Sequence, residues 1–354
     1  MKRLLALVTV FLLLVSAACA EDLTLIKNTD KNTIQMQKSY ADNPVVEGIS
    51  ATTGLPASGE KFTPVMLVLD NAEAAYPHWG VGQADIIFQV PNAGAGATKL
   101  LALFADHYPE QAGGTRSLRA SMVPLAKAWD AAIAYAGNPE PSSNHSNPSS
   151  LMSKLGMWKT KRPYNLMGAY AHRVDFVKRP HNSSCHILEI HENLLDNSVA
   201  FEQRPFLFTD EPRAEGEAAS FVKVSHKGDD KKARANAASA ATFTYREDLG
   251  AYIRTNSSGD YVDRDTGEVV PFANVIVLRV KFRWADGYVY LDNHLVGDGV
   301  AEIFQNGKYV RGAWFRESQD DRIVFVGPDG SELPMQRGKT FIVVTNDVTE
   351  VSYR

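Results

Sequence analysis

Two arginines three positions apart, Arg116 and Arg119, stand just before an apolar pattern of helical spacing within residues 113–131. Each guanidinium group presents several N–H donors in a rigid fork that suits a carboxylate or a phosphate. The backbone of Gly113–Gly114 and the positive end of a following helix could add donors for the same group. This stretch therefore predicts a clamp for one anion, with Arg116, Arg119 and the intervening Ser117 as contacts.

The start of the helix is set by Pro124, because proline has no amide hydrogen and is tolerated only in the first turn. If Ser121 is the N-cap, Pro124 takes the third helical position. The alternative is a helix that begins at Ser117 and kinks at Pro124. Either start leaves both arginines near the helix entrance.

A structural role competes with anion binding. Arg116 or Arg119 could instead pair with an internal carboxylate, for which Asp70 and Asp85 are plausible, and so lock the domain together. Asp85 comes two residues before the apolar Ile87 and is favoured as a structural partner. Ligand binding and an internal ion pair can also coexist.

Asp70 and Asn71 follow the apolar run of residues 65–69, which predicts a strand. Ligands gather at the carboxyl ends of strands in α/β sheets, so Asp70 is a candidate general base or polar contact, with Asn71 as its neighbour. The competing interpretation is helix capping, because Asp and Asn are strong N-caps and residues 72–75 favour helix. Capping is the favoured alternative.

His181 and Asn182 follow Lys178-Arg179-Pro180 and could supply a proton shuttle and an amide donor. A structural or merely exposed loop histidine is the alternative. The spacing of His181, Cys185, His186 and His191 fits no standard zinc pattern, so we predict no metal. We also predict no cofactor, because no Walker loop, Gly-x-Gly-x-x-Gly, His-Glu-x-x-His or Gly-x-Ser-x-Gly motif is present.

The segments around these residues predict two regions that differ in secondary structure. Apolar runs at residues 65–69, 86–90, 100–105 and 133–136, with helical periodicity between the last two, predict an α/β N-terminal domain over residues 50–209. Residues 210–354 contain β-branched and aromatic runs separated by turn residues, which predict a smaller β-rich C-terminal domain. A chain of 354 residues is long enough for two domains.

The N-terminus has the pattern of an export signal. Lys2 and Arg3 precede the apolar run of residues 4–15, and small residues follow, so residues 1–20 are predicted to be a signal peptide and residues 21–49 a tether. Cys19 lies in a lipobox-like stretch with Ser16 where leucine is usual, and its lipidation is favoured. Cleavage after Ala20 is the alternative. No later apolar run is long enough to span a membrane.

The charge of the chain limits its classes of partner, and its cysteine content limits the sources of its stability. Without Lys2 and Arg3 the chain has 35 basic and 41 acidic residues, which gives no support to a nucleic-acid partner. Once Cys19 is lipidated or removed, Cys185 has no intrachain partner, so stability must come from packing.

Several stretches together resemble the YerB-like lipoproteins, a bacterial envelope family of uncharacterised function. The likeness covers about residues 50–350, and it is carried by residues 53–57 (TGLPA), 65–71, 83–87, 98–104, 115–119 (TRSLR), 179–182 (RPHN), 274–277, 307–308, 312–314 and 338–341. The resemblance implies a lipid anchor on Cys19, an N-terminal α/β domain, a smaller β-rich C-terminal domain, and a location outside the cytoplasmic membrane or in the periplasm. It brings no established reaction. The sequence departs from the family at residues 183–185, where Leu and Tyr are expected after Pro-His-Asn.

These observations support three functions. The first is a membrane-anchored extracytoplasmic protein that binds an anionic envelope ligand in an arginine-lined cleft, with Asn71 and Asn182 nearby. The second is an envelope hydrolase or transferase in which Asp70 or His181 transfers a proton. The third is a scaffold that docks an envelope protein. An open cleft favours the first two, and arginines wholly consumed by internal carboxylates favour the third; membrane contact is expected through the lipid anchor only.

Overall fold

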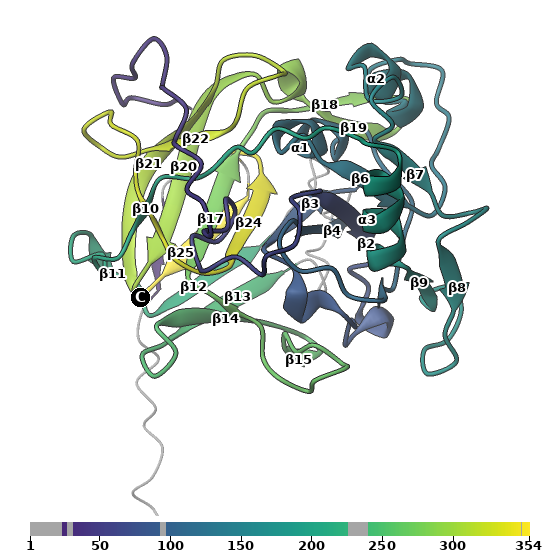
Figure 1. Cartoon of the computed structure of the whole chain (residues 1–354). Helices are drawn as coiled ribbons and strands as arrows, with labels where there is room; N and C mark the ends of the chain where they lie inside the picture. Colours follow the sequence, from purple (N-terminus) through teal and green to yellow (C-terminus); the bar gives the residue numbers. More distant parts are fainter. Residues whose placement is uncertain (1–22, 27–30, 93–96, 226–239, 348) are drawn as a thin grey trace, which may run out of the picture.

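The computed structural model describes residues 23–354 except 27–30, 93–96, 226–239 and 348 (Figure 1). The predicted signal peptide of residues 1–20, with Cys19, therefore lies outside the described residues. The same holds for most of the glycine-rich segment that joins the apolar runs at residues 86–90 and 100–105.

One large mixed sheet forms the centre of the described chain, and both halves of the sequence contribute to it. Ten strands lie in a row and an eleventh flanks one of them. In spatial order these are β11 (Glu217–Ala218), β21 (Lys308–Arg316), β20 (Gly297–Gln305), β17 (Asn274–Arg279), β24 (Thr340–Thr345), β3 (Ile86–Pro91), β4 (Thr98–Phe104), β2 (Val65–Leu69), β6 (Ala132–Tyr135) and β7 (Pro163–Asn165), with β22 (Val324–Val326) beside β21.

The halves meet at β24, which pairs in parallel with β17 on one side and with β3 on the other. Phe88 of β3 lies opposite Ile342 of β24, and Ile342 lies opposite Ile276 of β17. The central sheet therefore takes strands from both sides of the predicted boundary between residues 209 and 210.

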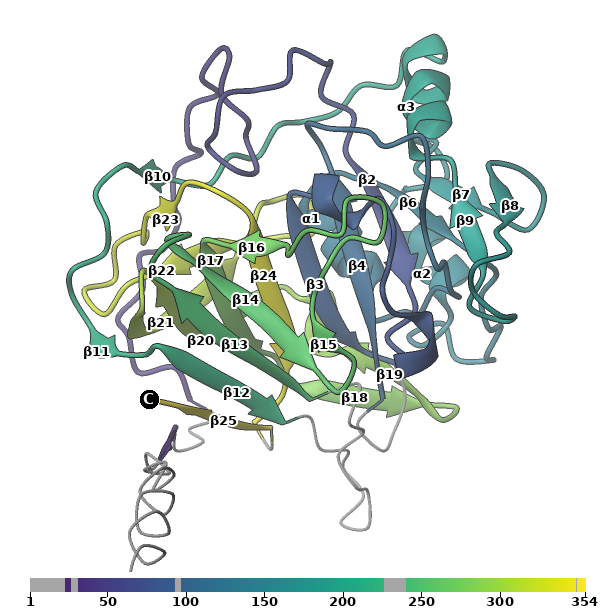
Figure 2. The ribbon, with the colours of Figure 1, turned by 90° about the horizontal axis from the view of Figure 1, so that it is seen from below.

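A second sheet packs against one face of the central sheet, over strands that come from the C-terminal half of the chain (Figure 2). Phe243 and Phe272 of this sheet each lie 5.1 Å, ring centroid to ring centroid, from Phe341 of the central sheet. The aromatic contacts bury both inner faces, which explains the β-branched and aromatic composition here. Its strands are β1 (Thr24–Leu25), β25 (Glu350–Tyr353), β12 (Phe221–Ser225), β13 (Ala241–Arg246), β14 (Ala251–Asn256) and β15 (Gly259–Asp260), with β16 (Pro271–Phe272) beside β14.

The remaining elements are short. The α-helices of the described chain are α1 (Val123–Ala128), α2 (Pro148–Lys154) and α3 (Ile187–Asp196), and the 3-10 turns are η1 (Glu73–Ala75), η2 (Val81–Gln83) and η3 (Asp292–His294). A small sheet joins β5 (Ala112–Gly113), β9 (Ser183–Cys185) and β8 (Ala171–Arg173). Two further pairs are β10 (Phe208–Thr209) with β23 (Met335–Gln336), and β18 (Phe282–Ala285) with β19 (Tyr288–Leu291).

The prediction of an α/β N-terminal domain is wrong, because the described residues are 37% strand and 10% helix. Strands β2, β4 and β3 pair antiparallel, and no crossover helix joins them. The helical spacing near residue 120 yields only the six residues of α1. Leu118 and Met122 are buried as an apolar face requires, but they precede the helix. Periodicity in a buried segment therefore did not distinguish helix from coil.

Both predicted starts of this helix are wrong. The N-cap of α1 is Met122, and Pro124 occupies the second helical position. Ser121 donates its hydroxyl to the carbonyl of Pro91 at 2.8 Å instead of capping the helix.

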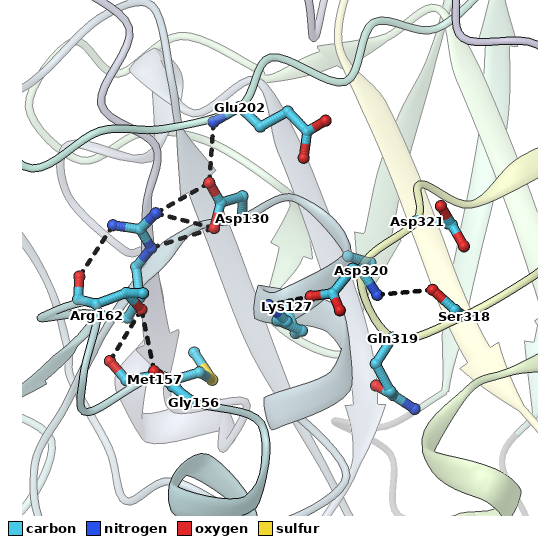
Figure 3. A network of polar contacts seen from close by, with 12 residues as sticks. Lys127, Asp130, Gly156, Met157, Arg162, Glu202, Ser318, Gln319, Asp320 and Asp321 are labelled. Atoms are coloured by element: carbon cyan, nitrogen blue, oxygen red, sulfur yellow. Dashed lines mark hydrogen bonds and ion pairs between the residues drawn. The ribbon is translucent and has the colours of Figure 1, made fainter.

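Ion pairs fix α1 and the residues after it (Figure 3). Asp130, in the left-handed region at φ 49°, follows the helix and accepts hydrogen bonds from the Arg162 guanidinium and from the amide of Glu202, each at 2.9 Å. Lys127 of α1 pairs with Asp320 at 2.6 Å, between β21 and β22. The helix and the residues after it are thus tied to both halves of the chain.

Candidate functional site

The site forms where β2 and β6 separate. These strands pair in parallel only up to Leu67 and Ala134, and beyond that point residues 114–118 lie between their carboxyl ends. The amide of Asp70 donates to the carbonyl of Gly114, and the amide of Arg116 donates to the carbonyl of Val68, each at 2.9 Å. On the other side, the amide of residue 136 donates to the carbonyl of Arg116 at 3.0 Å. The inserted segment therefore brings Arg116 to the end of β2.

This insertion corrects one part of the anion-clamp prediction. The amides of Thr115, Arg116 and Leu118 donate to the carbonyls of Ser183, Val68 and Gly137. They are therefore not free to bind a ligand.

Asp70 is the centre of a cluster that joins three residues predicted to act at the site. Its Oδ2 accepts a hydrogen bond from Arg116 Nε at 2.7 Å and contacts His181 Nδ1 at 2.6 Å. Its Oδ1 accepts the amide of Ala72 at 3.2 Å, while η1 starts at Glu73 without a side-chain cap. Asp70 thus stabilises a turn but does not cap a helix, and its side chain faces the arginine and the histidine.

Lys99 belongs to the same cluster, although sequence analysis did not single it out. Leu69 pairs with Leu100 across β2 and β4, so the next residues of the two strands, Asp70 and Lys99, lie on one face of the sheet. Lys99 is 7% exposed, and no described residue accepts a hydrogen bond or forms an ion pair with its ammonium group. The available signal was a lysine inside the apolar run that became β4.

Arg119 lies beside these cations and contacts no carboxylate among the described residues. Its Nη1 donates to the carbonyls of Ser117 and Leu118 at 3.3 and 2.9 Å. Its Nε is buried without a partner in the described chain, and its guanidinium carbon lies 5.9 Å from the centre of the Tyr288 ring. Arg119 is therefore held by carbonyls and an aromatic ring and not neutralised.

The pKa shifts in this cluster arise from burial and from three cations, Lys99, Arg116 and Arg119, that lie near one carboxylate, Asp70. Burial favours the neutral form of Asp70, but the positive charges of Lys99 and Arg116 and the hydrogen bond with His181 outweigh it and lower the pKa of this carboxyl. Burial lowers the pKa of Lys99 to about 8; attraction to Asp70 opposes this shift, and repulsion from Arg119 and Arg116 adds to it. Burial also lowers the pKa of Arg119. The cluster carries an excess of positive charge.

A cavity of about 310 Å³ opens on the other side of Arg116, between residues 114–118, the end of β7 and the small sheet. Arg116 and Arg173 line it, and no carboxylate is present among its described lining residues. Thr115 also lines it, and the hydroxyl of this residue is buried without a hydrogen-bond partner in the described chain. Ser117, Leu166 and Met167 complete the part of the wall considered below.

The predicted asparagines do not join this cavity directly. Asn182 accepts a hydrogen bond from Arg173 Nη1 at 2.7 Å and donates to the carbonyl of Val174 at 2.8 Å, so it orients Arg173. Asn71 points to the opposite face of the sheet from Asp70, where it donates to Thr98 Oγ1 at 2.7 Å and contacts the buried Arg254. The structure thus separates Asn71 from the arginine cluster.

Comparison with known proteins identifies the family. Residues 52–200 match the N-terminal domain, and residues 232–342 the C-terminal domain, of the family described as "Protein of unknown function (DUF3048)". The chain belongs to the DUF3048 family.

A DUF3048 relative supports the resemblance stated from the sequence. The Bacillus subtilis (strain 168) protein named "Putative lipoprotein YerB" is 26% identical over 291 residues, which are 82% of this chain and 83% of that protein. The crystal structure of YerB from Bacillus subtilis superposes with a TM-score of 0.69 and 25% identity, covering 86% of this chain and 99% of that one. The predicted membership of a YerB-like family is confirmed.

The relative also bears on location. Its name describes that relative as a putative lipoprotein. In the described part of this DUF3048 chain, the helices are too short or too polar to cross a membrane.

Two further titratable residues hold the DUF3048 fold around the site. His78 is buried, contacts the carbonyl of Asp70 through Nε2 at 2.7 Å, and has its pKa lowered to about 4 by burial. Asp85 lies apart from the arginines and accepts hydrogen bonds from Thr52 Oγ1 and the amide of Ala105 at 2.8 and 3.0 Å. The predicted pairing of Asp85 with Arg116 or Arg119 is therefore not found among the described residues, and its structural role stays a prediction.

The other residues weighed as metal ligands lie apart. Cys185 is fully buried in β9. His186 contacts His172 and Glu189, and His191 stacks on Tyr108. No group of three or more His, Cys, Asp or Glu residues within the described ranges has an arrangement that could hold a metal ion.

Proposed function

We propose that this DUF3048 protein binds an anionic ligand of the cell envelope, outside the cytoplasm, in the cavity bordered by Arg116 and Arg173. One observation carries the proposal: Arg116 gives only its Nε to Asp70, while its Nη nitrogens have no acceptor among the described residues and the guanidinium lines a cavity without carboxylates. The Arg116 side chain is 30% exposed, so a ligand can reach it.

The buried hydroxyl of Thr115 supports the same conclusion. A buried polar atom without a hydrogen-bond partner costs roughly 1–3 kcal/mol. Thr115 lines the cavity beside Arg116, and we propose that an anion bound there accepts a hydrogen bond from both side chains. An oxyanion with two or more acceptor oxygens fits this pair of donors.

The apolar part of the cavity wall indicates a further property of the ligand. Leu166 and Met167 also line the cavity, and Met167 is 73% exposed. An exposed methionine suits a ligand that carries an apolar portion beside its acid. A carboxylate-bearing peptidoglycan fragment has this chemistry, and a phosphate-bearing envelope polymer is the other ligand class.

Lipidation of Cys19 is part of the proposal, because the YerB relative bears a lipoprotein name and the residues before Cys19 resemble a lipobox. Mass spectrometry of the mature N-terminus tests it. Diacylglycerol on Cys19 is the expected result, and an unmodified chain that starts at Glu21 would show cleavage after Ala20 instead.

Calorimetry tests the binding site. Wild type, Arg116→Gln and Arg173→Gln are titrated with muropeptides and with phosphorylated glycans, and Arg246→Gln is the matched control because Arg246 pairs only at the surface with Asp248. Loss of a charge-assisted contact of about 1.5–3 kcal/mol predicts roughly tenfold to hundredfold weaker binding by the first two variants. Binding by folded Arg116→Gln as tight as that of wild type would remove Arg116 from the site.

A second function, an envelope hydrolase or transferase, is favoured by one contact. The Asp70 carboxylate orients the His181 ring through Nδ1, and no described residue contacts His181 Nε2. This arrangement lets Nε2 accept or donate a proton. Incubation of envelope polymers with wild type and His181→Gln, followed by mass spectrometry of released products, tests it; equal turnover by both proteins would exclude His181 as the proton carrier.

The scaffold function keeps one supporting observation, the Arg116–Asp70 ion pair. The expectation attached to it was that internal carboxylates would consume both arginines. Arg119 contacts none among the described residues, and Arg116 uses one of its three nitrogens, so the scaffold is the weakest of the three functions.

A further inference from the structure

We propose that Lys99, Arg119 and Arg116 form an inner subsite that binds a second anionic group of the ligand. This inference rests on the proposed function, because it concerns the same ligand. It assigns a role to Lys99 and extends the site from the cavity to the opposite side of Arg116.

The geometry places the three cations on one face of the sheet end. Lys99 comes from β4 and lies beside Asp70 in the register of β2 and β4. Arg116 and Arg119 come from the loop that separates β2 from β6 and leads into α1. Lys99 is more than nine-tenths buried, and its ammonium group has no acceptor among the described residues.

The charged and titratable groups that face Lys99 do not neutralise the cluster. Among the described residues Asp70, which directly follows β2, is the carboxylate that attracts Lys99, and Arg116 and Arg119 repel it. Tyr288 on β19 faces Arg119, and His181 contacts Asp70 from its own loop. Three cations held near one carboxylate, two of them largely removed from water, raise the free energy of the unliganded protein. An anion that enters the cluster relieves this repulsion.

The charge excess indicates the chemistry of the second group. Arg119 has a buried Nε without a partner, and Lys99 offers a compact charge with three donors. Together with the cavity at Arg116 and Arg173, the site suits a ligand with two negative groups. The two groups are either two phosphates or two carboxylates, and the experiment below distinguishes them with diphosphate and succinate.

Proton uptake gives a specific readout for Lys99. Its pKa of about 8 means that the amine is partly neutral at pH 8. A bound anion favours the charged form, so binding at pH 8 draws up to about half a proton from the buffer. A residue with a merely structural role would not couple binding to proton uptake in this way.

The experiment is calorimetry at pH 8 in two buffers of different ionisation enthalpy, with inorganic phosphate, inorganic diphosphate and succinate as probes. Wild type is expected to bind diphosphate or succinate at least tenfold more tightly than phosphate, and to take up protons with succinate, whose two carboxylates are fully ionised at pH 8 and have no proton to release. Lys99→Met should bind at least tenfold more weakly without uptake. Lys99→Arg should keep the affinity within about threefold and lose the uptake. Lys159→Met, which removes an exposed lysine, should behave as wild type.

The outcomes separate this inference from the proposed function. If Arg116→Gln loses binding while Lys99→Met keeps both affinity and proton uptake, the inner subsite is refuted and the cavity remains. If Lys99→Met is unstable, Lys99→Arg decides, because unchanged uptake in that variant also refutes the subsite. If wild type binds none of these probes or the envelope ligands, both proposals fail.

Discussion

Replacement of Asp70 by asparagine should weaken the fold and strengthen anion binding at the same time. Asparagine has nearly the same shape, and its oxygen can still accept the hydrogen bond from Arg116 Nε. The substitution removes the carboxylate that balances Lys99, Arg116 and Arg119. A protein in which Asp70 is only a counter-ion will respond in opposite directions in the two measurements.

The magnitudes come from the burial and charge of the cluster. Removing one partner of a fully buried ion pair costs about 3–5 kcal/mol, and the 30% exposure of Arg116 reduces this to about 1–3 kcal/mol for Asp70→Asn. For binding, a carboxylate about 7 Å from a bound anion repels it by about 2 kcal/mol at an effective dielectric of about 20. Its removal therefore predicts binding that is roughly tenfold to thirtyfold tighter.

The pH dependence of stability gives a third check. The folded pKa of Asp70 is lowered from 3.8, so its contribution to stability is present above pH 3.8 and is lost as the pH falls through the folded pKa. The free energy of unfolding of Asp70→Asn should therefore lack the decrease that protonation of Asp70 causes in wild type at low pH.

Urea unfolding from pH 2 to 7 and calorimetry with diphosphate measure the two effects. If Asp70→Asn binds the anion more weakly than wild type while it remains folded, Asp70 contacts the ligand. The counter-ion reasoning would then be wrong, and the proton-transfer function would gain support.

Three other changes test separate parts of the structure. Burial raises the pKa of Asp85 from 3.8 to about 6, so the free energy of unfolding should fall by up to about 3 kcal/mol as the pH rises from 4 to 6, and Asp85→Asn should flatten this slope in urea titrations. Thr115→Val removes an unpartnered buried hydroxyl; it should leave the melting temperature within a few degrees and weaken anion binding several-fold, as read by thermal melts and calorimetry. Burial raises the pKa of the Cys185 thiol, so a thiol reagent should modify native protein at less than about one-hundredth of the rate in urea.

The sequence predicted the strands well where burial and β-branching agree. The runs at residues 65–69 and 86–90 became β2 and β3 because both faces of the central sheet are covered there. The pairing of these strands was not predictable, because β3 lies between β4 and β24, and β24 is about 250 residues later in the sequence. Long-range pairing leaves no local pattern, whereas the α/β prediction was wrong because the helical periodicity near residue 120 belongs mostly to buried coil.

The residues of the site were predicted in part. Asp70, Arg116 and His181 were singled out by residue type, and the structure places them in contact, while their roles stay predictions. Lys99 was missed because the register of β4 against β2, which places it beside Asp70, is not visible in a single sequence. Arg173 was missed because its place in the cavity wall depends on the fold, in which Asn182 accepts a hydrogen bond from Arg173 Nη1.

The position of β24 also constrains how the chain can fold. Residues 340–345 lie between a strand of the first third and a strand of the last third of the sequence, so a nascent chain exposes the edge of β3 until its final fifteen residues are available. A truncation after residue 339 leaves two unpaired edges in the middle of the sheet, and such a fragment should associate with itself or be degraded.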